Sequence, residues 1–100
     1  MKPHANSHEN ESLHHLYAIF DVERDIIYKY GICGKSLYSD GSSPRANEQV
    51  ALYNRVVGMA RFFAFILLIE IEGRKLAEKI EQEHIDDFCK KHGHNPPGNI

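Results

Sequence analysis

The residue of this chain best placed for chemistry is Glu81, an acid on the apolar side of an amphipathic segment. At about 100° of rotation per helical residue, Ala77 and Ile85 fall roughly 40° either side of Glu81, and Phe88 falls about 20° from it. The other acids nearby point away from this stripe: Glu78, Glu83, Asp86 and Asp87. A carboxylate directed toward a core is costly unless it is paired or holds a metal. Glu81 is therefore the first candidate for a functional residue.

Two interpretations of Glu81 stay open from the residues alone. It could be a structural carboxylate paired with Arg74, Lys29 or Arg45, because ion pairs also perturb buried acids. It could instead bind a hard divalent cation such as Mg²⁺, which often takes one or two protein carboxylates and keeps its waters. His84 lies about 60° from Glu81 on the helical wheel, so it could support such a metal site or simply be packed.

Three further residues could complete a site. Tyr17 lies in a β-rich run opposite Lys29 and Gly31, Arg45 opens a helix where the dipole disfavours positive charge, and Asn99 sits in a rigid Pro-Pro-Gly-Asn tail. A base, a guanidinium and a buried carboxylate are the parts needed for metal-assisted phosphoryl transfer. Arginine suits phosphate because its planar fork binds two oxygens and keeps its charge. The structural alternatives are an ordinary strand tyrosine and a solvated arginine.

Bulk composition sets limits on partners. The chain has 100 residues, enough for one domain, and its formal charge of −2 excludes a global cationic field that would demand nucleic acid. A local basic groove is still compatible with the cations of the first two thirds: Lys29, Lys35, Arg45, Arg55 and Arg61. Two cysteines make no disulfide framework. The apolar run Phe62–Ile69 is too short for a membrane span. The irregularly spaced histidines are expected to be solvated: His4, His8, His14 and His15.

Local patterns predict a β-hairpin, a helix, a strand and a helix. The first half comprises a polar arm over 1–13, strands over Leu16–Phe20 and Ile26–Ile32 joined by a polar turn, a loop over Cys33–Pro44, and a helix over Arg45–Val57. Ser43 is expected to cap this helix, and Gly58 to end it. Period two turns Tyr28 and Tyr30 away from the face of Lys29.

The second half contains the most hydrophobic segment, Met59–Ile71. Its unbroken apolar run favours a central strand covered on both faces, with Phe62, Phe63 and Phe65 in the core, and a buried helix is the competing prediction. An amphipathic helix over Arg74–Lys91 and an irregular tail follow. This order predicts an α+β or mixed α/β class.

The motifs, taken in order, resemble the GIY-YIG nuclease superfamily over residues 13–100. LYAIF with Tyr17 looks like the first name motif, and Lys29-Tyr30-Gly31 in YKYGI looks like the second. SPRANEQV looks like the family's arginine helix, AEKIEQEHI has its spacing of Ala, Glu and Ile, and PPGN looks like its closing asparagine. The resemblance implies an α+β fold in which a small, mostly antiparallel three-stranded sheet is flanked by helices.

The same resemblance implies a metal-dependent endonuclease using Mg²⁺ or Mn²⁺ on nucleic acid, with DNA favoured over RNA. Its catalytic residues would be Tyr17, Lys29, Tyr30, Arg45, Glu81 and Asn99, with Glu81 on the metal, and its substrate-binding residues Gly31, Lys35 and Arg55. Arg55 is also the reserve for Arg45, because a serine-rich insertion precedes Arg45. The closest likeness is to compact modules of bacterial polymorphic toxins. That branch implies delivery from a larger secreted toxin into the cytoplasm of a target or host cell, an immunity protein as partner, and no membrane partner.

One departure from the family pattern affects the site. Lys29 stands where most members carry tyrosine, and it could hold a phosphate or lower the pKa of Tyr17. A non-catalytic domain of the same fold that binds nucleic acid or protein is therefore the alternative, and a purely structural module is a third.

Overall fold

The computed structural model describes residues 12–100, and the α+β prediction is confirmed. Its elements in chain order are β1 (Leu13–Asp21), β2 (Ile26–Cys33), α1 (Pro44–Val57), β3 (Phe62–Glu72) and α2 (Arg74–His92). Residues 1–11 of the predicted arm lie outside the described residues, and so do His4 and His8. No helix of the described part is long and apolar enough to cross a membrane.

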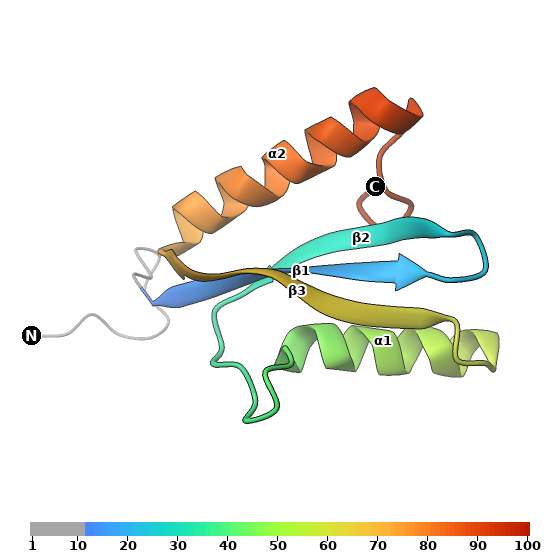
Figure 1. Ribbon diagram of the computed structural model, residues 1–100, viewed down its shortest axis with the longest axis horizontal. Coiled ribbons are helices and arrows are strands. Elements are labelled where there is room, and N and C mark those ends of the chain that lie inside the picture. Colours follow the sequence, from blue (N-terminus) through green and yellow to red (C-terminus); the bar gives the residue numbers. More distant parts are fainter. Residues whose placement is uncertain (1–11) are drawn as a thin grey trace, which may run out of the picture.

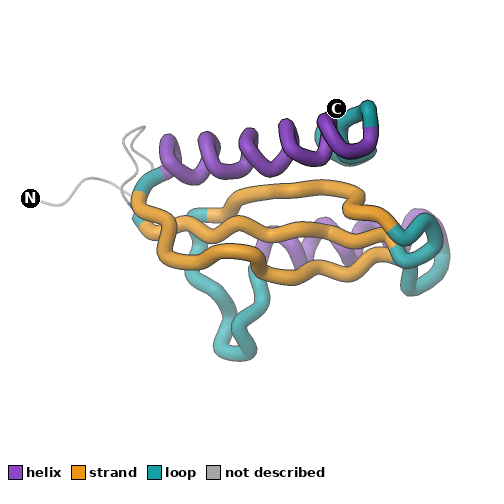
Figure 2. Tube along the Cα trace, turned by 45° about the horizontal axis from the view of Figure 1, so that its top comes forward, coloured by secondary structure: helices purple, strands orange, loops and turns teal. Residues whose placement is uncertain are grey.

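The three strands form one antiparallel sheet in the order β2-β1-β3, with a helix on each face (Figures 1 and 2). The α1 side holds a buried cluster of Tyr17, Ile19, Cys33, Ala46 and Phe62. The α2 side holds a smaller cluster of Leu16, Ile71 and Ala77. Alternate residues of β1 therefore supply both cores, as period two requires.

The prediction of a central, two-sided strand over Met59–Ile71 is wrong. The segment forms β3 at the edge of the sheet, and the centre is β1. Phe62 is buried, but Phe63 and Phe65 are 50% and 43% exposed, so neither belongs to the core as expected. In an unbroken apolar run, polar and apolar residues do not alternate. The sequence therefore does not indicate which face of the strand is covered.

Tyr28 also departs from its predicted orientation. A β-bulge between Ile19 and Phe20 interrupts the β1–β2 register. Tyr28 thereby packs in the α1-side cluster, with its ring centroid 4.9 Å from that of Phe62 and 5.4 Å from that of Tyr53. The bulge shifts the alternation of faces, which strict period two could not anticipate.

Both helices end as their sequences predict. Ser43 caps α1 by accepting a hydrogen bond from the amide of Ala46, and Pro44 occupies the first turn. Gly58 and Gly93 close α1 and α2 in the left-handed conformation, at φ 74° and 79°.

The far end of the hairpin is fixed to β3 by one buried acid. Asp21 accepts two hydrogen bonds from the guanidinium of Arg61, at 2.9 and 2.8 Å, and a third and fourth from the amides of Glu23 and Arg24. These bonds, led by that of Arg61, lower the pKa of Asp21. The ionised carboxylate thus stabilises both the turn after β1 and the start of β3.

Replacing Asp21 with asparagine should lower the free energy of unfolding by about 1–3 kcal/mol, because the charged hydrogen bonds to Arg61 are lost. Since the pKa is depressed in the folded state, this stabilisation is present above the unfolded pKa and is lost as pH falls through the folded pKa. Urea unfolding of wild type and Asp21→Asn should therefore differ at neutral pH and converge at acid pH. The exposed Asp40→Asn change is the control, and an equal effect of both changes would contradict the assignment.

Candidate functional site

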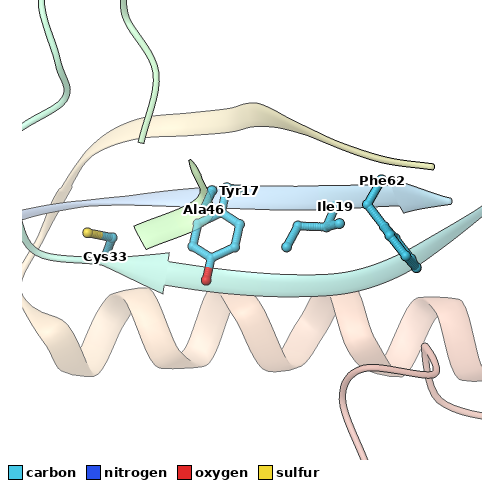
Figure 3. Packing of buried hydrophobic residues seen from close by; sticks show 5 residues of the cluster. All are labelled: Tyr17, Ile19, Cys33, Ala46 and Phe62. Carbon is cyan, nitrogen blue, oxygen red and sulfur yellow. The ribbon is translucent and has the colours of Figure 1, made fainter. Parts of the chain in front are cut away.

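The side chain of Tyr17 crosses the sheet from β1 over β2. Tyr17 and Gly31 are paired across the two strands. A Cβ atom built on Gly31 would overlap the Cζ and hydroxyl oxygen of Tyr17 and lie 2.7 Å from its Cε1. The glycine therefore leaves the space through which the ring extends, and Figure 3 shows the hydroxyl reaching over β2.

The hydroxyl of Tyr17 ends beside a polar hollow at the start of α1. It donates a hydrogen bond of 2.7 Å to Oε1 of Gln49. A hollow of about 340 Å³, here called the Arg45 hollow, is lined by Lys35, Arg45, Glu48 and Gln49. Two predicted residues, Arg45 and Lys35, thus line one hollow, and Gln49 connects that hollow to the hydroxyl of Tyr17. Glu48 and Gln49 were missed, although the spacing of four residues from Arg45 places Gln49 on the same side of the helix.

The start of α1 is held in place by a buried histidine on β1. Nε2 of His15 lies 2.7 Å from Oγ of Ser43, and that Oγ also caps the helix at Ala46. The pKa of His15 is lowered by burial and further by the charge of His14. His14 is also buried, with Nδ1 2.8 Å from the carbonyl of Ser12. The expectation that these two histidines are solvated is therefore wrong, and His15 is a structural tether for the helix that carries Arg45.

The pKa of the Tyr17 hydroxyl is strongly raised, chiefly by burial. The positive charge of Arg45 opposes this rise, while Cys33 and Glu81 add to it. The phenol is consequently protonated at neutral pH in the free protein. Arg45 on α1 and Glu81 on α2 thus influence the pKa of this hydroxyl in opposite directions.

Glu81 lies half-buried on the covered side of α2, between the buried residues Ala77 and Ile85, as the helical wheel predicts. The pKa of Glu81 is raised, chiefly by burial and next by the charge of Glu78. The charges of Lys29 and Arg74 oppose this rise only in part. Within residues 12–100 it forms no salt bridge and no side-chain hydrogen bond, and Arg74 pairs instead with Glu78 at 3.1 Å. The structure therefore does not show the ion pair that was one interpretation of Glu81.

An unpaired, half-buried carboxylate fits a hard divalent cation. Over residues 12–100 no group of three or more His, Cys, Asp or Glu side chains is arranged to hold a metal ion. A cation at Glu81 would accordingly take one protein ligand and keep most of its water, a coordination that suits Mg²⁺.

Tyr30 lies on the α2 side of the sheet, opposite the side of Tyr17, and contacts His84 of α2 there. Their ring centroids are 5.4 Å apart, and Nδ1 of His84 lies 2.9 Å from the carbonyl of Ile80. Both line a cavity of about 670 Å³ between the hairpin and the second half of α2. The structure therefore does not bring Tyr30 to the Tyr17 hydroxyl, whereas His84 lies one turn beyond Glu81.

Asn99 acts on the backbone of β2. Its side chain accepts a hydrogen bond from the amide of Tyr30 at 2.8 Å and donates one to the carbonyl of Tyr30 at 2.9 Å. The amide of Gly98 donates to the carbonyl of Tyr28 at 2.7 Å. The tail thus holds β2 on both sides of Lys29.

Arg55, the reserve candidate, does not line the Arg45 hollow. It is exposed in the last turn of α1, about 15 Å along the helix from Arg45. Arg45 is therefore the arginine that the fold brings to Tyr17.

Replacing Gly31 with alanine should cost about 1–3 kcal/mol of folding free energy, because the new methyl group overpacks against the Tyr17 ring. In a Tyr17→Leu background the Cζ and hydroxyl atoms are absent, so the same change should cost less. Urea unfolding of the four proteins in this double-mutant cycle measures the coupling. An equal cost of Gly31→Ala in both backgrounds would show that the ring does not occupy this space.

Comparison with known proteins identifies a family. No curated protein and no solved structure matches the chain. A family model described as URI fold toxin 2 matches residues 7–93, which is most of the chain. The chain therefore belongs to the URI fold toxin 2 family.

Proposed function

We propose that this toxin domain is a metal-dependent endonuclease of the GIY-YIG type, which hydrolyses phosphodiester bonds in nucleic acid. The observation that carries the proposal is the buried hydroxyl of Tyr17, which bonds to Gln49 beside a hollow lined by Arg45 and Lys35. The pKa values of Tyr17 and of Glu81 are both raised, and perturbed acids of this kind are typical of functional sites. The motif order of the sequence supports the same assignment.

Arg45 and Lys35 would bind the substrate phosphate in the Arg45 hollow. The guanidinium can contact two phosphate oxygens and stabilises the charge that grows on them during hydrolysis. The Lys35 ammonium adds a second positive charge on the same wall of the hollow.

Tyr17 would orient the attacking water. Because its proton is directed at Gln49, the phenolic oxygen keeps its lone pairs free to accept a hydrogen bond from that water. The charge of Arg45 lowers the pKa of the same hydroxyl and so favours loss of its proton, against the effect of burial. Gln49 acts through Tyr17 and is a positioning residue.

Glu81 would hold Mg²⁺ or Mn²⁺. When bound, the cation supplies positive charge that stabilises the phosphate and the leaving oxygen. The charge of Lys29 opposes the rise in the pKa of Glu81 and so favours the ionised carboxylate, which metal binding requires. Lys29 therefore acts on Glu81 in this arrangement, and the cation that lowers the pKa of Tyr17 is Arg45.

As a toxin effector, the domain would be delivered within a larger secreted protein and act in the cytoplasm of a target or host cell. An immunity protein that inhibits it would cover the Arg45 hollow. The substrate would be nucleic acid, with DNA favoured over RNA.

A non-catalytic binding domain of the same fold is the second candidate. The observation that favours it is the strongly raised pKa of Tyr17, which opposes a role as base. A binder would not need Mg²⁺ and would show a clear dependence of affinity on salt.

Replacing Glu81 with glutamine should reduce cleavage by roughly 10²-fold or more, the scale of losing one electrostatic stabiliser of a transition state. The assay incubates purified protein with plasmid, linear DNA and total RNA, in Mg²⁺ and in chelator. Glu78→Gln, an exposed acid one turn away, should cleave like wild type. Full activity of Glu81→Gln, or full activity of wild type in chelator, would refute the metal site.

The pH dependence gives an independent test of Lys29. Since the pKa of Glu81 is raised, activity should rise with pH through a value above that of an ordinary glutamate, as the carboxylate ionises. Lys29→Met removes the charge that lowers this pKa. The rising limb of the pH–activity profile should therefore move to higher pH. Lys35→Met should lower the rate and leave the limb in place. Identical limbs in wild type and Lys29→Met would contradict the role given to Lys29.

A further inference from the structure

The two edge strands of the sheet, β2 and β3, differ in how far other parts of the chain cover their outer backbone groups. The free edge of β2 is covered by the tail, through the paired hydrogen bonds of Asn99 with Tyr30 and the bond from Gly98 to Tyr28. On β3, the described residues show side-chain cover only at Phe62, whose amide and carbonyl bond to the side chain of Asn54 at 2.8 and 3.0 Å. An uncovered edge strand is a template for pairing with another chain.

The backbone of β3 presents specific groups at this edge. Phe62 directs its amide and carbonyl outward to Asn54, while the carbonyl of Arg61 accepts from the amide of Val22 beside β1. Successive residues alternate in direction, so Ala64 and Ile66 also direct their amides and carbonyls outward. The register with β1 is unbroken from Phe62 to Ile66 and bulges beyond it. The usable edge therefore ends near Leu67.

A row of apolar side chains lies beside the same edge. Phe63, Phe65 and Leu67 are 50%, 43% and 36% exposed. They alternate with Phe62, Ala64 and Ile66, which pack on the α1 side, so the row points to the opposite face. No lysine or proline interrupts residues 62–72. Contiguous apolar groups at a bare edge are typical of an association surface.

We propose that two copies of this domain associate through their β3 edges, antiparallel, with Phe65 opposite Phe65 of the second copy. This register pairs Ala64 with Ile66 of the other copy, so that the outward backbone groups bond to each other and Phe62 keeps its bonds to Asn54. Phe63 then lies beside Leu67 of the second copy on the same face, so the two exposed rows pack against each other along the contact. The contact has two-fold symmetry and joins the two sheets into one.

Charge favours the antiparallel arrangement with a second copy. The acids at the end of β3, Glu70 and Glu72, would lie at opposite ends of such a contact, whereas a parallel arrangement would place them side by side. Glu70 also has φ 56° in a bulged part of the strand, which turns the acidic end out of the pairing. The dimer thus uses only the neutral stretch of the edge.

The area involved sets the strength of the contact. The exposed area of each exposed phenylalanine is roughly 100 Å², half of what such a side chain buries in full, and the contact covers only the part that faces the second copy. The total over two copies falls below the roughly 1,200 Å² of a stable interface. We therefore expect a reversible dimer that forms with increasing protein concentration. No residue of β3 lines the Arg45 hollow, so the dimer leaves it open and does not depend on the proposed function.

Sedimentation velocity of the purified domain over a micromolar concentration series tests the proposal. For wild type, the mass-average molar mass should rise with concentration toward twice the monomer mass. For Phe65→Lys it should stay at the monomer mass, because the two lysines would repel each other across the contact. Leu52→Lys, a 51% exposed leucine on α1, is the matched control and should dimerise like wild type. Circular dichroism and urea unfolding verify that each variant is folded.

Mixing provides the register test. Phe65→Lys and Phe65→Glu should each be monomeric alone and should associate when mixed, because position 65 faces itself across the two-fold axis. Wild type that stays monomeric over the series, or Phe65→Lys that still dimerises, would overturn the proposal. A mixture that stays monomeric while wild type dimerises would overturn the assigned register. Nucleic-acid cleavage by Phe65→Lys separates this result from the fate of the proposed function, since the substitution lies outside that site.

Discussion

The crossing of Tyr17 over Gly31 is the constraint on which the rest of this structure depends. A tyrosine on the central strand can place its hydroxyl beside α1 only because the neighbouring strand has no side chain at that point. Close packing leaves no room for both groups. The ring also fills the α1-side core, so one side chain contributes to stability and brings a polar group to the Arg45 hollow.

Buried polar contacts position the elements around this crossing. His15 and Ser43 join β1 to the start of α1, and Asn99 joins the tail to β2. Asn54 binds the backbone of Phe62 as Asn99 binds that of Tyr30, so one asparagine amide holds each outer strand. A buried polar group that loses its hydrogen-bond partner costs free energy of folding. These bonds therefore fix the spacing of the helices against the sheet.

Much of the fold follows from local sequence. The hairpin, the Ser43 cap, the glycine stops and the stripe of α2 were predicted because each depends on neighbours a few residues apart. The predictions that failed depend on long-range facts. The exposure of Phe63 and Phe65, the inward turn of Tyr28 at a bulge, and the burial of His14 and His15 are all set by which strands and helices meet.

The sequence by itself determined the residue types of the candidate site, the period that puts Glu81 on the covered side of α2, and a motif order that resembles a nuclease family. Only the tertiary structure decided which of these groups meet. It bonds Gln49 to the hydroxyl of Tyr17, places Arg45 in the hollow beside that bond and Arg55 outside it, and turns Tyr30 toward His84. The physical reason is that electrostatic and hydrogen-bonding partners are fixed by distances across the sheet, and no spacing along the chain encodes those distances.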